Sequence, residues 1–253
     1  MKQVLFSAML AAVLISFAAG QNISGAPQAS LNPEHTSASN HPTPSGSKPQ
    51  PPPFCRPCLF YAGDFDSNAS DANGLANEVD VTVSTGAATY VPFTVPKGKV
   101  WNVTGLLTLN FMSSTTLDPK TSPYEVRRGI PKAGGNGGHL VCHGKKPVTV
   151  MDSRACQGFG FSCFYVIVKN VKGCRLPAGK YWESVVPYCT GSECGSFRAF
   201  ITNDDGAMVN RWGPLEPAND SFFNSEFFSA VWQPSTEQQT SKRFSAGVEG
   251  TEK

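Results

Sequence analysis

Alternating apolar and polar residues run through much of the chain and predict short β-strands. Valines alternate with polar residues over 79–83, and the same period of two recurs over 91–95. This is the period of a strand with one buried face. The residues 96–98, Pro-Lys-Gly, then favour a turn.

The same pattern predicts a series of further strands along the chain. They cover residues 101–111, 124–128, 139–143, 147–151, 159–168, 180–186, 197–201, 207–212 and 244–248. The segment 159–168 is apolar on both faces, which indicates a place near the centre of a packed sheet. Residues 222–232 are ambiguous, because Phe223, Phe227 and Val231 have helical spacing. Short strands separated by Gly, Pro and Asn turns predict an all-β, jelly-roll-like β-sandwich, and a closed barrel fits the same periodicity.

The first 54 residues do not have this pattern. Residues 1–20 resemble a secretory signal, with Lys2 before an apolar stretch and small residues before Gln21. Residues 21–54 are rich in Pro and Ser and have little apolar surface to bury, so they predict a disordered tether. We therefore expect a single domain over 55–250 and a short tail over 251–253.

Composition narrows the class of protein. Only 16% of residues are charged and the formal net charge is +2, which gives no overall electrostatic signature for nucleic acid. After the signal segment no apolar run is long enough to span a bilayer. We expect a mature chain without a transmembrane span or a nucleic-acid partner, located outside the cell, at the envelope exterior or in the periplasm.

Eight cysteines lie in the predicted domain, an even number that favours disulfides in an exported chain. Cys189 and Cys194 flank a turn at Gly191 and are predicted to pair. The pairing of the others stays open; they are Cys55, Cys58, Cys142, Cys156, Cys163 and Cys174. The Cys55-Arg56-Pro57-Cys58 motif fits a structural bridge, a redox dithiol or a zinc site. A redox motif would begin a helix, whereas the residues that follow favour a strand.

Oxygen-bearing side chains recur at alternate positions over 64–74, as in a calcium-binding loop. The candidate ligands of this structural calcium site are Asp64, Asp66, Asn68 and Asp71. Ala69 replaces the glycine of an EF-hand, and Leu75 replaces its closing glutamate. An Asx-rich turn is the alternative. We expect no other cofactor.

Catalytic motifs are sparse. His139 and His143 have the spacing of helical metal ligands, but glycines on both sides favour a strand, on which the rings would be about 13 Å apart. The sequence has no Gly-x-Ser-x-Gly motif, and the glycine-rich run 134–138 lacks the Lys-Ser/Thr ending of a phosphate loop. We therefore expect no enzymatic activity and no catalytic residues.

The tryptophans are the remaining candidates for ligand binding. Aromatic faces pack well against the apolar faces of sugars. The candidates for such a platform are Trp101, Trp182, Trp212 and Trp232. In strands of a sandwich, tryptophans more often belong to the core, which is the alternative interpretation.

Several short strings occur in order over residues 63–248. They are GDFD at 63–66, NGLANE at 73–78, FTVP at 93–96, WNVTGL at 101–106, YEVRRG at 124–129, GGHLV at 137–141, LPAGKYW at 176–182 and FSAGV at 244–248. Together they resemble a group of exported bacterial proteins of unknown function with a jelly-roll-like β-sandwich. The resemblance implies a fold and an exported location, and it supplies no catalytic residues.

The expected function is therefore that of an exported, non-catalytic interaction or structural module with a polysaccharide or a surface protein as partner. A carbohydrate-binding module is the first alternative, based on the tryptophans. A hydrolase acting on polysaccharide is the second, because unpaired acidic residues could meet in space.

Overall fold

The computed structural model describes residues 54–65, 73–80, 85–112, 121–158, 161–189, 199–204, 211–214, 216, 220–238 and 243–253. In these residues the fold is all-β, as predicted, with one short 3₁₀ helix at Ser235–Glu237. The early strands are β1 (Cys58–Tyr61), β2 (Asn73–Ala76), β3 (Glu78–Asp80), β4 (Thr85–Met112) and β5 (Ser122–Arg128). The middle strands are β6 (His139–Lys146), β7 (Val148–Gly158), β8 (Phe161–Lys169), β9 (Arg175–Val185) and β10 (Tyr188–Cys189). The last strands are β11 (Ala199–Asp204), β12 (Phe222–Ser225), β13 (Ala230–Pro234), β14 (Arg243–Phe244) and β15 (Ala246–Glu252).

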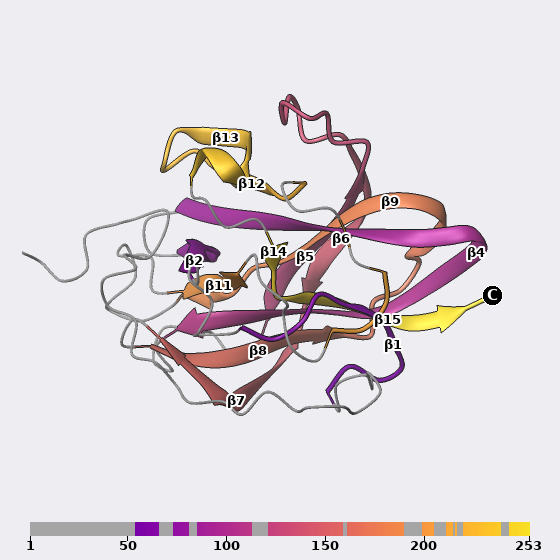
Figure 1. The fold of residues 1–253 in the computed structure, drawn as a ribbon, viewed down its shortest axis with the longest axis horizontal. Coiled ribbons are helices and arrows are strands. Elements are labelled where there is room, and N and C mark those ends of the chain that lie inside the picture. The colour runs from indigo at the N-terminus through magenta and orange to yellow at the C-terminus, as the bar shows by residue number, and fades with distance from the viewer. Residues whose placement is uncertain are drawn as a thin grey trace, which may run out of the picture.

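A bent strand, β4, organises the whole fold. The two strands predicted before and after residues 96–98 are the two arms of β4, which meet at a bend (Figure 1). The register against β9 shifts here, because Val95 pairs with Gly179 whereas Val100 pairs with Pro177. Gly98 has a φ of 79° at the bend, a conformation that glycine adopts without steric cost. A single strand thus passes from one layer of the fold to the other.

Each arm of β4 forms the centre of one layer. The first arm, residues 85–95, pairs with β9, β3 and β12, while β5 and β6 extend the layer beyond β9. The second arm, residues 100–112, pairs with β15, β8 and β11, and β1 and β7 lie beyond β15 and β8. All of these pairs are antiparallel, whereas the short β3–β10 pair is parallel. The layers are therefore those of a sandwich joined at the bends of β4 and β9.

Apolar side chains fill the space between the layers. Phe93 stacks on Trp101 with ring planes 1° apart, so the two arms of β4 contact each other through aromatic side chains. Strand β8 contributes buried residues from both faces, which confirms the central position predicted from its apolar pattern. Val166 and Val168 belong to one apolar cluster and Tyr165 and Ile167 to another.

A buried polar network also connects the layers. The Asn77 side chain donates to Oδ1 of Asn110 (3.0 Å) and to the carbonyl of Val185 (2.9 Å), and it accepts from the N–H of Thr89 (3.2 Å). Thr108 donates to the same Val185 carbonyl at 3.1 Å. Asn110 and Thr108 come from the second arm of β4, and Thr89 comes from the first. The network therefore fixes how the two arms face each other.

Replacing Asn77 with alanine should destabilise the domain by about 2 kcal/mol, because buried donors and acceptors lose their partners. Chemical denaturation followed by circular dichroism would measure the loss. Asn102→Ala is the matched control, since Asn102 is only half-buried in the same strand as Asn110. Equal losses in the two variants would contradict a structural role for the network.

Two disulfides hold the margins of the fold. Cys55–Cys58 closes the segment before β1, and Cys142–Cys174 connects β6 of the first layer to the turn before β9. Cys163 is disulfide-bonded as well. Disulfides form and persist in oxidising compartments, so they suit the predicted export. Within the described residues, no helix is long and apolar enough to cross a membrane.

Residues just outside both predicted domain boundaries contact the fold. Phe54, placed in the tether by its sequence context, packs its ring 3.8 Å from that of Tyr165. At the other end β15 continues to Glu252, which pairs with Trp101, so the predicted tail belongs to the sheet. The ambiguous segment 222–232 forms the hairpin of β12 and β13. The signal segment and the rest of the tether lie outside the described residues.

Candidate functional site

Asp64, the first residue of the predicted calcium loop, contacts two tyrosines. Its Oδ1 accepts hydrogen bonds from the hydroxyls of Tyr61 and Tyr165, at 2.5 Å and 2.6 Å. Burial, followed by the charge of Asp64, raises the pKa of Tyr61 well above its ordinary value. Asp64 therefore anchors the segment after β1 to β8. The other three candidate ligands, Asp66, Asn68 and Asp71, lie outside the described residues, and the calcium site stays a prediction.

Three of the four tryptophans are buried, as the alternative interpretation as core residues expects. Trp101, Trp182 and Trp232 are each 8% exposed or less, and Trp212 packs against a buried cluster. Their indole N–H groups are used internally: Trp101 donates to Glu252, Trp182 to the carbonyl of Asp220, and Trp212 to the carbonyl of Cys58. Their apolar area stabilises the fold instead.

The glycine-rich run 134–138 forms the packing surface for Trp232. Arg127 lies over the Trp232 ring, 4.5 Å from its centroid, and donates to the carbonyl of Gly137. Glu125 accepts from both Arg127 (2.6 Å) and the Tyr90 hydroxyl (2.8 Å). Burial, and then Glu125, raises the pKa of Tyr90 above its ordinary value. The run thus completes a cluster of aromatic and charged side chains on one face of the first layer.

The structure places the remaining cysteine and histidine motifs on or beside strands. Cys55 and Cys58 form a disulfide, and a strand follows them instead of a helix. Cys194 lies outside the described residues, as does the side chain of Cys156, so the predicted Cys189–Cys194 pair stays a prediction. His139 and His143 are exposed on the predicted strand β6. No group of three or more potential metal ligands occurs within the described ranges.

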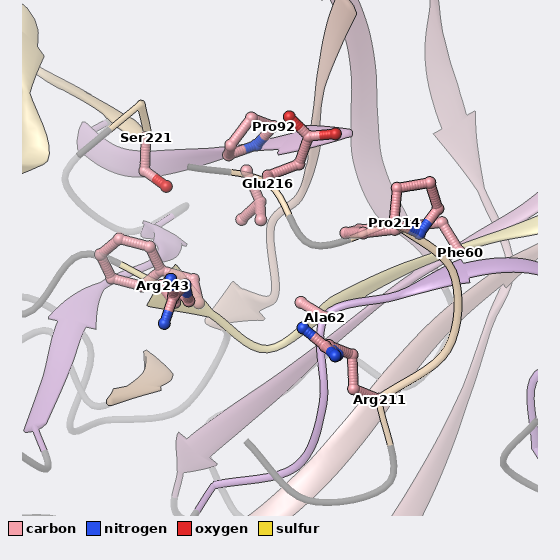
Figure 2. A pocket seen from close by; sticks show the side chains of 10 residues that line it. Phe60, Ala62, Pro92, Arg211, Pro214, Glu216, Ser221 and Arg243 are labelled. Carbon is pink, nitrogen blue, oxygen red and sulfur yellow. The ribbon is translucent and has the colours of Figure 1, made fainter. Parts of the chain in front are cut away.

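A small pocket with a cavity volume of about 20 Å³, partly open to solvent, lies between the two layers (Figure 2). Phe60 and Ala62 of the second layer and Val91 and Pro92 of the first supply an apolar floor, together with Phe244. Four polar side chains also line the pocket: Arg211, Glu216, Ser221 and Arg243.

The segment that covers this pocket, here called the strap, comprises residues 211–214, 216 and 220–221. It is held at one end by Trp212, whose backbone pairs with Tyr61 at 2.8 Å and 2.9 Å. At the other end the carbonyl of Asp220 accepts from Trp182 at 2.6 Å. Ser221 then leads into β12, whose first residue pairs with Tyr90 of β4. The strap therefore connects the edges of the two layers and fixes Arg211 and Ser221 at the pocket.

The charges at the pocket are unequal. Figure 2 shows Arg211 and Arg243 on different sides of the pocket, with the carboxylate of Glu216 pointing away from both. Glu216 lies 3.8 Å from Nζ of Lys180, which also bonds to Asp220. Its negative charge is thus partly countered by Lys180. The two guanidinium groups place two positive charges on the lining of the pocket.

No motif in the sequence predicts this site. Arg211 and Arg243 belong to no common motif and are separated by 32 positions in the chain. Only the crossing of the strap and the pairing of β14 with β11 bring them to one pocket. Comparisons with protein-family models, with curated proteins and with solved structures find no match to this chain.

Proposed function

We propose that this chain is an exported, non-catalytic binding module that holds an anionic ligand in the strap pocket. The observation that carries the proposal is the pairing of two guanidinium groups with an apolar floor in one pocket between the layers. Concave sites with apolar walls and a few polar groups are typical of ligand binding. The disulfides support work in an oxidising compartment.

The chemistry of the pocket favours a ligand with an anionic group on a compact apolar body. Guanidinium groups bind carboxylate, sulfate and phosphate through paired hydrogen bonds. The rings of Phe60 and Pro92 offer apolar surface to the remainder of the ligand. An acidic sugar meets both requirements, since its ring has apolar C–H faces. This keeps the carbohydrate-binding alternative while moving its site from the tryptophans to the strap pocket.

A polysaccharide hydrolase has less support. Such enzymes use two carboxyl groups about 5–10 Å apart across the scissile bond. Glu216 is the one acidic residue among the described residues that line the pocket, and it is directed toward Lys180. The described geometry thus supplies charge for binding and no second carboxyl group for acid–base chemistry at this pocket.

The double variant Arg211→Gln/Arg243→Gln should weaken binding of an acidic sugar by about tenfold or more, because the charged hydrogen bonds are lost. Calorimetry with glucuronate and galacturonate as probes, and glucose as the neutral comparison, would measure this. Arg56→Gln/Arg175→Gln is the matched control, since both arginines are exposed outside the pocket.

Two outcomes would contradict the proposal. One is equal affinity of the wild-type protein for glucose and glucuronate, and the other is equal affinity of the pocket variant and the wild type for glucuronate. Release of reducing sugar from an acidic polysaccharide would show that the protein is a polysaccharide hydrolase and not a binding module.

A further inference from the structure

The near-neutral net charge hides a strong local imbalance. Residues 121–182 contain ten Lys or Arg and two Asp or Glu, whereas the rest of the chain contains eleven basic and seventeen acidic residues. Of the two acidic residues, Glu125 is already bonded to Arg127. A chain with a formal charge of only +2 therefore has one strongly basic part.

Several of these basic residues meet at an open groove with about 1070 Å³ of empty space. Lys146 comes from the end of β6, Lys169 from the end of β8, and Lys172 from the turn that follows. Thr149 and Asn170 add polar groups to the same lining. This groove is distinct from the strap pocket, with which it shares no lining residue.

The lysines of the groove differ in their pairing. Lys169 bonds to both carboxylate oxygens of Glu249, which is buried and also accepts from the N–H of Arg56 at 3.2 Å. Lys146 and Lys172 form no ion pair with any carboxylate in the described ranges. Their charges are therefore available to a ligand from outside.

The two sides of the groove are fixed to each other. Cys142 on β6 forms a disulfide with Cys174, two residues after Lys172. Val171, beside Lys172, is buried and donates its N–H to the carbonyl of Thr104 at 3.1 Å. Holding the backbone beside both lysines reduces the ordering cost of binding a ligand across the groove.

We propose that this groove binds an extended acidic polysaccharide through the ammonium groups of Lys146 and Lys172. Ammonium groups act as point charges that suit repeated carboxylate or sulfate groups. Proteins that bind single-stranded nucleic acid add aromatic side chains for base stacking, and the lining of this groove contains none. The proposal does not depend on the strap pocket.

The test uses the full chain and heparin, a sulfated polysaccharide, as the probe. Lys146→Glu/Lys172→Glu should weaken heparin binding at least tenfold and should reduce the slope of log K against log salt by roughly two, through lost counterion release. Lys97→Glu/Lys99→Glu changes the net charge equally at the bend of β4, where both lysines are exposed, and should leave most of the affinity. Circular dichroism would verify that both variants are folded.

Equal losses in the groove variant and the control would overturn the proposal, since they would show attraction by net charge alone. The wild-type protein could instead bind single-stranded DNA more tightly than heparin and lose that binding in the groove variant. This result would show that the ligand of the groove is a nucleic acid and not a polysaccharide. The Arg211→Gln/Arg243→Gln variant should keep its heparin affinity, so that failure at one site is distinguishable from failure at the other.

Discussion

Gly134→Ala should remove about 4 kcal/mol or more of the domain's stability, the largest loss that we expect from adding a single methyl group. A Cβ at residue 134 would lie 1.2 Å from the carbonyl oxygen of Trp232. Both clashing partners are backbone, so no side-chain rotation relieves the overlap. The residue also has a φ of 77°, which alanine adopts at a cost.

Gly98→Ala separates these two causes. Gly98 has a φ of 79°, yet nothing lies within 4 Å of the position of its Cβ. We expect this variant to lose about 1 kcal/mol, the cost of the left-handed backbone alone. Urea denaturation followed by circular dichroism would measure both variants. Similar losses would show that the contact between Gly134 and Trp232 has no structural importance.

Glu183→Leu should have the opposite effect and stabilise the domain, by about 3 kcal/mol at pH 8 and about 1 kcal/mol at pH 4. Glu183 is fully buried between Val91 and Val126 on the neighbouring strands. Neither of its carboxyl oxygens has a hydrogen-bond partner of good geometry among the described residues. Leucine has a similar volume and leaves no polar atom in this place.

The pH dependence follows from the protonation of Glu183. Burial raises the pKa of Glu183 well above its ordinary 4.5, and the N–H of Gly247 opposes the rise without reversing it. The folded state then holds a proton that the unfolded state releases. This contribution to stability is complete below about pH 4.5 and is lost as the pH rises through the pKa of the folded state. The gain from Glu183→Leu therefore increases with pH.

Urea denaturation at pH 4, 6 and 8 would measure this profile. Glu183→Gln keeps the shape of the side chain and should flatten the profile as well, whereas Glu226→Gln, on an exposed turn, should not. The buried tyrosines do not interfere, because the pKa values of Tyr61 and Tyr165 are raised from 10 and lie above this range. A profile that is unchanged in Glu183→Leu would show that this carboxyl group does not titrate on unfolding.

The alternation of apolar and polar residues was sufficient for the fold class. The predicted segments overlap strands β5, β6, β8 and β9. Alternation with a period of two shows that one face of a strand is buried, and it does not depend on which strand is the partner. The hairpin of β12 and β13 was ambiguous, since its phenylalanines have helical spacing. Pairing of Phe222 with Tyr90 resolved it, and that contact joins residues far apart in the chain.

The candidate sites were less predictable. The glycine-rich run 134–138 did not fit a phosphate loop, and only the structure shows that its glycines leave room for Trp232. A tryptophan can belong to a core or to an exposed binding platform, and the residue type does not distinguish the two. Only the structure shows that Trp101, Trp182 and Trp232 are buried. The basic groove is an intermediate case: the charge imbalance over 121–182 is visible in the sequence, whereas the pairing of Lys169 with Glu249 is not.

The amino-acid sequence was sufficient to predict an all-β fold, because the period of two and the turn residues depend only on neighbouring positions in the chain. Its eight cysteines predicted disulfides, with a partner suggested only for Cys189 and Cys194. The tertiary structure alone decided that β4 serves both layers, that the strap brings Arg211 to Arg243, and that Cys142 bonds to Cys174. These features depend on which distant segments meet, and long-range packing sets that choice.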